Sequence, residues 1–175
     1  DAGRPAQPGH SGGPAGAITA LELAKAGVSL VVLEREVRSG WKLGEGLPPA
    51  AKPILQQLGL WERFLADGHL ASYGNCSAWG SDALVDHSFV FHPHGCGWHL
   101  NRSRFDQLLL NAAVEAGAKL VFDAEVETTA ADFMVDASGR SSWLARRRQA
   151  RRITHDNLVG SAALLKAGND VADQD

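Results

Sequence analysis

A glycine-rich segment, Ser11-Gly12-Gly13-Pro14-Ala15-Gly16, is the first place where residue types and spacing can do chemistry. It opens an alanine-rich helical pattern, and the acid Glu34 ends the strand-like run that follows that pattern. Glycines at a helix start let the backbone approach a pyrophosphate, and an acid about 20 residues later bonds a ribose hydroxyl. The segment therefore predicts a dinucleotide site, against the alternative of a plain glycine turn before a helix.

Two features of this region depart from the dinucleotide pattern. Ser11 occupies the first glycine position of G-x-G-x-x-G, where the chain must turn tightly. Pro5 and Pro8 exclude a central strand before the glycines. We therefore expect residues 1–11 to be a flexible lead-in, and both the sheet and the cofactor site to be weakened.

Two other clusters of reactive side chains favour structural roles. Histidines and a cysteine alternate over residues 92–96, with His99 nearby, as metal ligands can. However, Pro93 and Gly95 interrupt a regular strand, and no second ligand pair stands at metal-site spacing, so we predict no metal site. The arginines of residues 146–152 lack interleaved aromatic residues, which favours a solvated helix face over a nucleic-acid patch.

The elements that must position the glycine segment and Glu34 are predicted from hydrophobic periodicity and from turn residues. The predicted helices cover residues 14–26, 47–67 (two short helices hinged near Gly59), 101–116 and 142–150. The predicted strands cover residues 29–34, 118–124, 132–137 and 158–165, with an antiparallel group in 71–100. Helices that alternate with strands predict an α/β fold with a parallel sheet, joined by a smaller antiparallel part.

Composition excludes several classes of protein. The 175 residues suit one domain or slightly more, and a net charge of −3 predicts no nucleic-acid or membrane partner. No apolar run approaches the roughly 20 residues of a membrane span, and no signal peptide opens the sequence, so we expect a cytoplasmic protein. Two cysteines are too few for a disulfide scaffold, and nothing in the sequence indicates an oligomeric state.

Five segments in order carry a resemblance to a known family. They are GGPAGAITALELAKAG, VVLERE, GEGLPPAAKPILQQLGLWE, WHLNRSRFDQLLLNAAVEAGA and VDASGRSS. Together they resemble the flavoprotein monooxygenase superfamily. The resemblance is closer to its branch of tryptophan-halogenase-like proteins, geranylgeranyl-reductase-like proteins and flavoproteins that help to build quinone cofactors. It runs from Gly12 to about Leu165.

The resemblance implies a Rossmann-like FAD-binding domain, here incomplete, in two parts, 12–70 and 101–165. A partial antiparallel β-sheet substrate subdomain, 71–100, lies between them, and 166–175 form a disordered tail. The implied activity is that of an oxidoreductase of the monooxygenase or halogenase type, using reduced FAD and oxygen. Its substrate would be an aromatic or similar organic group, on a small molecule or a peptide, with NADH or NADPH as external reductant.

The resemblance also assigns residues to the adenosine end of FAD. Glu34 would hold the adenosine ribose, and Arg35 would lie beside the adenine. The residues that would lie against the pyrophosphate are Gly12, Gly13, Ala15 and Gly16.

Three further loops match family motifs. Glu45 matches a G-E-S-L-P-like loop near the isoalloxazine, although Gly46 replaces the usual serine. Arg102 matches R-x-x-F/L-D, where the arginine reaches the cofactor phosphates, and Asp136 and Gly139 match D-x-x-G-R near the pyrophosphate. Taken singly, Arg102 also fits a surface ion pair, Asp136 a turn cap and Glu45 a solvated loop acid.

Parts of the family pattern are absent from this sequence. The later G-D motif and the substrate domain do not occur before Asp175, and the strand pair expected between Asp123 and Asp132 is shortened. These absences, together with that of the first strand, predict a truncated or decayed gene or an assembled fragment, and no catalytic residue is assigned. The alternative hypothesis is a non-catalytic remnant or binding module without stable FAD.

Overall fold

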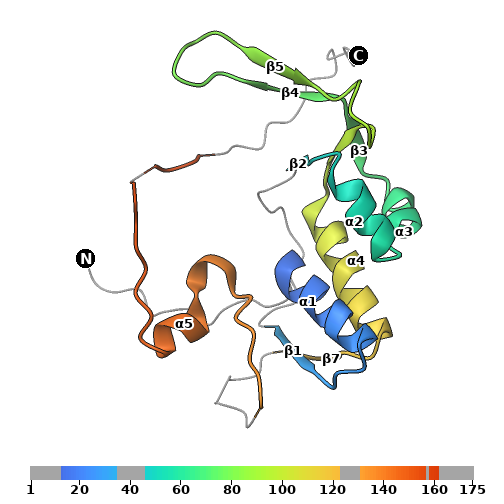
Figure 1. Ribbon diagram of the computed structural model, residues 1–175, viewed down its shortest axis with the longest axis vertical. Helices are drawn as coiled ribbons and strands as arrows, with labels where there is room; N and C mark the ends of the chain where they lie inside the picture. The colour runs from blue at the N-terminus through green and yellow to red at the C-terminus, as the bar shows by residue number, and fades with distance from the viewer. Residues whose placement is uncertain (1–12, 35–45, 123–130, 157, 162–175) are drawn as a thin grey trace.

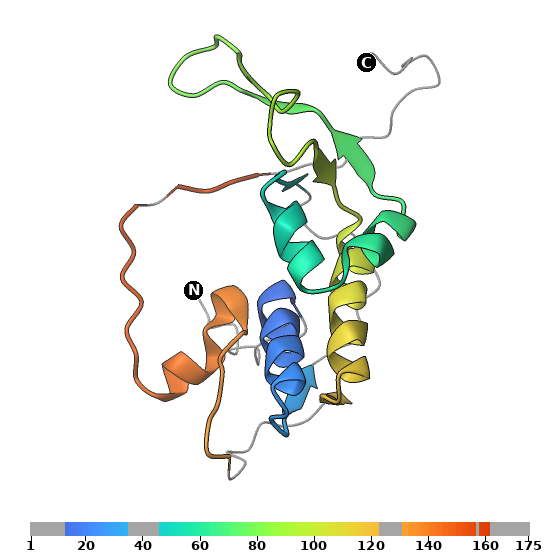
Figure 2. The same cartoon turned by 45° about the vertical axis from the view of Figure 1, so that its right-hand side comes forward.

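The computed structural model describes residues 13–34, 46–122, 131–156 and 158–161. Two helices lie side by side over a pair of parallel strands, and two short helices adjoin them at one end (Figures 1 and 2). Small antiparallel sheets continue beyond the short helices. The fold is therefore a partial Rossmann-like α/β domain with small antiparallel sheets, as predicted.

The first helix–strand unit consists of α1 (Pro14–Lys25) and β1 (Val31–Glu34). Pro14 stands at the first helical position, where its missing N–H costs no helical hydrogen bond. Gly27 has φ +79° and ends the helix in the left-handed region, so that the chain turns back as β1. The predicted helix and strand are both present, and the strand begins two residues later than residue 29.

The second unit consists of α4 (Arg102–Glu115) and β7 (Lys119–Phe122), and it has the same design. Asn101 caps α4 by accepting the Arg104 N–H at 3.2 Å. Gly117, with φ +110°, ends the helix and leads into the strand. β1 and β7 pair in parallel, from Val31 opposite Lys119 to Glu34 opposite Phe122.

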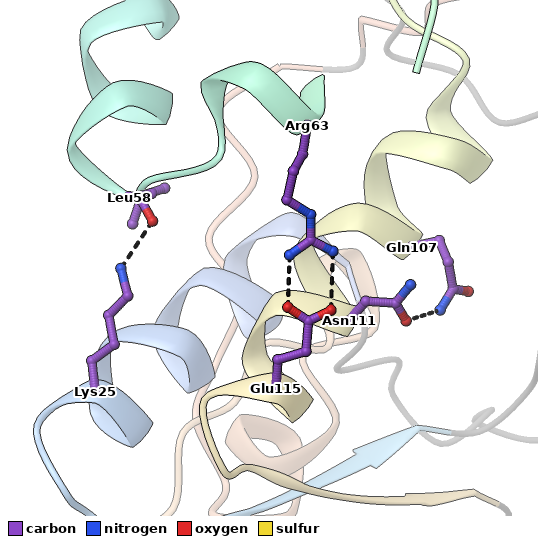
Figure 3. Close-up of polar contacts among 6 residues, drawn as sticks. All are labelled: Lys25, Leu58, Arg63, Gln107, Asn111 and Glu115. Carbon is purple, nitrogen blue, oxygen red and sulfur yellow. Dashed lines mark hydrogen bonds and ion pairs between the residues drawn. The ribbon is translucent and has the colours of Figure 1, made fainter. Parts of the chain in front are cut away.

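Two short helices, α2 (Ala51–Gln57) and α3 (Trp61–Ala66), adjoin α1 and α4. Gly59, with φ +74°, makes the turn between them, as predicted. Figure 3 shows the polar contacts that fasten this pair: Lys25 Nζ donates to the Leu58 carbonyl at 3.0 Å. Arg63 donates to both carboxylate oxygens of Glu115, at 2.7 and 3.1 Å.

The antiparallel part forms two sheets among the described residues. The first has the order β2 (Gly46–Leu47), β6 (Gly97–His99), β3 (Leu70–Ser72). The second is the hairpin of β4 (Gly74–Ser77) and β5 (Val85–Ser88), which extends away from the helices (Figure 1). A Cβ at Gly97 would lie 2.8 Å from the Leu47 carbonyl oxygen, so only glycine allows β2 and β6 to approach this closely.

The hydrophobic core lies among α1, α2, α3 and α4. Phe64 and Leu109 are its largest fully buried side chains. The Phe64 ring contacts Trp98 edge-on, with centroids 5.3 Å apart, and Phe105 likewise at 5.9 Å. The core residues of these helices and their flanking strands are Ala17, Ala20, Leu21, Val32, Leu55, Leu58, Leu60, Phe64, Leu100, Phe105, Leu108, Leu109, Leu110, Ala112, Ala113 and Ala118.

The prediction of two further strands is wrong for the described residues. Residues 132–137 belong to no strand, and Phe133 is 93% exposed. Residues 158–161 are not a strand either, while the rest of the predicted 158–165 strand lies outside the described residues. A strand requires a neighbour that takes up its backbone N–H and C=O groups, and no described strand lies alongside these segments.

The basic helix predicted over 142–150 is shorter than expected. A 3₁₀ turn at Gly139–Ser141 leads into α5 (Trp143–Arg147), and Ser142 between them has φ +45°. Among the described residues, no helix is long and apolar enough to cross a membrane. The predicted lead-in 1–11 and tail 166–175 lie outside those residues.

Candidate functional site

The N-terminus of α1 carries the glycines of the predicted pyrophosphate site. Gly13 is the N-cap, with φ −71° and ψ 173°, a conformation that any residue adopts. A Cβ built on Gly13 meets no described atom within 4 Å. Neither backbone conformation nor packing among the described residues therefore requires glycine there. The first turn of α1 contains no acidic residue, so the positive end of the helix dipole is not offset within that turn.

The two other described residues of the glycine segment differ in their surroundings. Ala15 is exposed on the first turn of α1, where the first N–H groups of a helix have no intrahelical partner. Gly16 is buried. Gly12, which the sequence assigns to the same site, lies outside the described residues.

Glu34 is a buried acid, 8% exposed, at the C-terminal end of β1. Since β1 turns back from the end of α1, its C-terminal end lies at the same side of the unit as the N-terminus of α1. A carboxylate that is buried at the end of a parallel strand stands where dinucleotide-binding folds bond a ribose. Arg35, the next predicted residue, lies outside the described residues.

Arg102 is the first residue of α4 and pairs with Asp106 one turn later. The Arg102 Nε and Nη2 atoms both donate to Asp106 Oδ1, at 3.3 and 3.2 Å. Both side chains are largely buried, with exposures of 18% and 7%. The alternative expected for Arg102 was an ion pair at the surface, whereas the pair with Asp106 is largely buried. The i,i+4 spacing of Arg102 and Asp106 was the signal that could have revealed it.

The two helix–strand units place these features at one end of the domain. α1 and α4 each precede a strand of the same parallel pair, so the two helices run in the same direction (Figures 1 and 2). The N-terminus of α1, the N-terminus of α4 with Arg102, and the end of β1 with Glu34 therefore lie toward the same edge. This is the edge where parallel α/β sheets bind ligands.

Asp136 makes its hydrogen bonds within its own segment. Its Oδ1 accepts the Ser138 N–H at 3.0 Å, and its Oδ2 accepts the N–H groups of Leu144 and Ala145 at 3.0 and 3.1 Å. Partial burial raises the pKa of Asp136, but hydrogen bonds from the Ser138 side chain and from these backbone N–H groups outweigh that effect and hold the pKa below its ordinary value. Asp136 thus caps the turn at Ser138 and the start of α5. The alternative from the sequence expected such a cap after a strand, but residues 132–137 are not a strand.

Gly139 follows in the same segment with φ +61°, a conformation that side chains rarely adopt. Its conformation alone therefore explains the glycine, and a cofactor contact at Asp136 or Gly139 stays a prediction. Glu45, the predicted residue of the isoalloxazine loop, lies outside the described residues.

His69, which is 8% exposed, is a buried polar residue near this edge that the sequence did not single out. Its Nδ1 accepts the Asn101 N–H at 3.1 Å, just before Arg102. A single histidine between a glycine and an apolar strand carries no sequence signal of such a role.

The histidine cluster of residues 92–96 and the arginines of residues 146–152 lie partly or fully at the surface. His94 N–H donates to His92 Nδ1 at 3.2 Å, and in the described ranges no three histidine, cysteine or acidic side chains gather to hold a metal ion. The arginines of residues 146–152 are exposed, and the Arg147 guanidinium lies 4.8 Å from the centroid of the Trp143 ring.

Comparison with known proteins gives a consistent result. The family described as "FAD binding domain" matches residues 11–161. The chain is 29% identical over 186 residues to a putative FAD-dependent oxidoreductase, LodB, of Marinomonas mediterranea, covering 93% of this chain and 50% of that protein. It is 32% identical over 179 residues to the 1H-pyrrole-2-carbonyl-[peptidyl-carrier protein] chlorinase of Pseudomonas fluorescens, covering 78% and 39%.

Among solved structures, the myxobacterial chondrochloren halogenase CndH, described as a variant of FAD-dependent halogenases, superposes with a TM-score of 0.58 at 30% identity. The match covers 65% of this chain and 27% of that one. This chain thus spans half or less of each of these three proteins.

Proposed function

We propose that this chain holds the adenosine and pyrophosphate end of FAD. The premise is that the chain belongs to the FAD-binding domain family of flavin-dependent halogenases and related oxidoreductases. The observation that supports this proposal most directly is the common edge shared by two helix N-termini and the buried Glu34. A diphosphate is attracted by the helix dipoles and by Arg102, and a ribose hydroxyl donates to a carboxylate.

The fit of the described residues to FAD rests chiefly on Gly13. The position has an ordinary φ, and a Cβ built there meets no atom of the described residues within 4 Å, which supports a ligand that approaches the backbone as the reason for the glycine. In this proposal Gly12, Gly13, Ala15 and Gly16 face the pyrophosphate, Glu34 and Arg35 the adenosine, and Glu45 the isoalloxazine loop. Arg102, Asp136 and Gly139 complete the phosphate surroundings. FAD, when bound, supplies the electron-transfer and oxygen chemistry.

The proposed reaction of the whole protein rests on the relatives that this chain resembles. The relatives include a chlorinase of a carrier-bound pyrrole and the halogenase of the superposed structure. These names support an oxidoreductase that uses reduced FAD and oxygen on an aromatic or similar organic group, on a small molecule or a peptide. NADH or NADPH would be the external reductant. The chain's own residues bind and orient the cofactor.

The test is equilibrium titration of this chain with FAD, ADP and FMN. We expect ADP, which carries the adenosine and diphosphate, to compete with FAD, and FMN to compete weakly. Gly13→Val should abolish FAD binding and leave the far-UV circular dichroism unchanged, because a side chain there fills the space for the pyrophosphate. Gly160→Val is the matched control, since a Cβ built at that glycine likewise meets no atom within 4 Å in the part of the chain that the structure describes.

Two outcomes would contradict the proposal. One is FMN binding as tightly as FAD, and the other is undiminished FAD binding by Gly13→Val. If the folded chain binds neither ADP nor FAD, it behaves instead as a remnant or binding module without FAD.

A further inference from the structure

His69 is a buried histidine that connects the end of α3 to the start of α4. Its ring packs against Phe64, with centroids 4.7 Å apart, and against Phe105 at 6.3 Å. Its Nδ1 accepts the backbone N–H of Asn101 at 3.1 Å, across 32 positions of the sequence. The residue therefore combines an apolar setting with one directed polar contact.

The contact belongs to a closed set of hydrogen bonds. Asn101 in turn caps α4 by accepting the Arg104 N–H at 3.2 Å. Arg104 Nη1 donates back to the Asp67 carbonyl at 3.1 Å, two residues before His69. The chain at residues 67–69 and the first turn of α4 thus hold each other, and Arg102 lies within that turn.

The hydrogen bond defines the form of the imidazole. A ring nitrogen that accepts an N–H carries no proton, so the proton of neutral His69 is on Nε2. Nε2 is buried and has no hydrogen-bond partner among the described residues. Burial lowers the pKa of His69; the nearby Asp67 carboxylate opposes that effect, and the Arg104 guanidinium adds to it. The neutral ring, which can accept from Asn101, is therefore favoured at neutral pH.

We propose that His69 is a positioning residue for the phosphate end of the cofactor site, and that it acts through Asn101 to set the first turn of α4 and so the direction of Arg102. The inference rests on the proposed function, because it takes Arg102 to face the FAD phosphates. A proton on Nδ1 abolishes the acceptor, so acidification through the pKa of folded His69, which burial holds below its ordinary value of 6.5, releases the turn. Asp67 and Arg104 are the charged groups that face the ring.

Two substitutions separate the acceptor from the ring. His69→Phe keeps the aromatic packing against Phe64 and Phe105 and removes the acceptor. His69→Asn removes the ring and keeps an oxygen near the position of Nδ1. We expect His69→Phe to raise the Kd for FAD about tenfold and to speed hydrogen exchange at the Asn101 amide by a similar factor. His69→Asn should restore both to within about threefold of the unmodified chain.

The pH profile supplies a readout that packing alone does not change. FAD affinity of the unmodified chain should fall as the pH passes below 6.5 and through the lowered pKa of His69, and that of His69→Asn should stay level over the same range. Equal losses in the two variants, or a slow Asn101 exchange rate in His69→Phe, would overturn the proposal. Arg102→Ala separates the two ideas: if it leaves FAD affinity unchanged, the phosphate role of Arg102 fails, while exchange at Asn101 still decides whether His69 holds the turn.

Discussion

The helical half of the molecule and the segment 131–161 differ in how their apolar side chains are covered. In the helical half, Phe64 and Leu109 have no exposed surface, and the core cluster of the described residues ends at Ala118. In the later segment, Phe133 is 93% exposed, and Ile153, Leu158 and Val159 are also exposed. The first region buries its own apolar surface, whereas the second is shaped by local hydrogen bonds such as those of Asp136.

This difference shows when an apolar sequence pattern is sufficient to predict a helix or a strand. α1 and α4 are amphipathic and each meets the other, so their apolar faces are removed from water and the helices are stabilised. The run 132–137 has comparable apolar residues, but it does not pair with a strand among the described residues. An apolar pattern alone therefore predicts a conformation only where a partner surface is available.

The largest expected effect tests this contrast with two phenylalanines. Phe64→Ala should lower the free energy of unfolding by about 3–5 kcal/mol, because it removes a buried ring and leaves a cavity. Phe133→Ala should change it by less than about 0.5 kcal/mol, since an exposed ring loses little on truncation. Urea denaturation followed by circular dichroism measures both values.

The contrast between the two regions is contradicted if Phe133→Ala destabilises the chain as much as Phe64→Ala does, because residue 133 would then be buried in solution. Phe64→Leu, a smaller reduction in volume, keeps the measurement possible if Phe64→Ala does not fold.

The helical half was predicted well because its signals are local. Gly27, Gly59 and Gly117 all adopt positive φ at the ends of helices, and Asn101 caps α4 as its residue type predicted. The strand predicted at 132–137 is absent, and so is the described part, 158–161, of the strand predicted at 158–165. Strand formation depends on a neighbouring strand, which no local pattern reveals.

The candidate site was predicted only in part for the same reason. The positions of Gly13 and Glu34 follow from a helix and a strand that the sequence indicates. The pairing of Arg102 with Asp106 and the contact of His69 with Asn101 depend on packing, and the second spans distant parts of the chain. The cofactor roles themselves remain predictions.

A prediction of intermediate size tests whether local hydrogen bonds determine the conformation of segment 131–161. Asp136→Ala should destabilise α5 by about 1 kcal/mol, the usual scale for losing a helix cap, without changing the free energy of unfolding of the helical half. Asp132→Ala, on the same segment, is the control. Amide hydrogen exchange at Leu144 and Ala145 distinguishes the two variants.

The pH dependence of this cap follows from the lowered pKa of Asp136. A carboxylate whose pKa is depressed by folding contributes stability above its unfolded pKa, near 3.8, and loses it as the pH falls through the folded value. The amide resonances of Leu144 and Ala145 should therefore be constant from pH 7 to 5 and shift only below pH 3.8. A shift at higher pH would show that Asp136 does not accept those bonds.

The smallest expected effect concerns the polar contacts on the outside of the helical half. The Arg63–Glu115 pair has good two-pronged geometry, yet the side chains are 41% and 61% exposed, so water and salt weaken their attraction (Figure 3). A double-mutant cycle with Arg63→Gln and Glu115→Gln should give a coupling of about 0.2–1 kcal/mol, falling further at 1 M salt. A coupling above about 2 kcal/mol would mean that this region depends on surface ion pairs as well as on its buried core. A coupling energy in the expected range would mean that the helical half is stabilised mainly by the packing around Phe64 and Leu109.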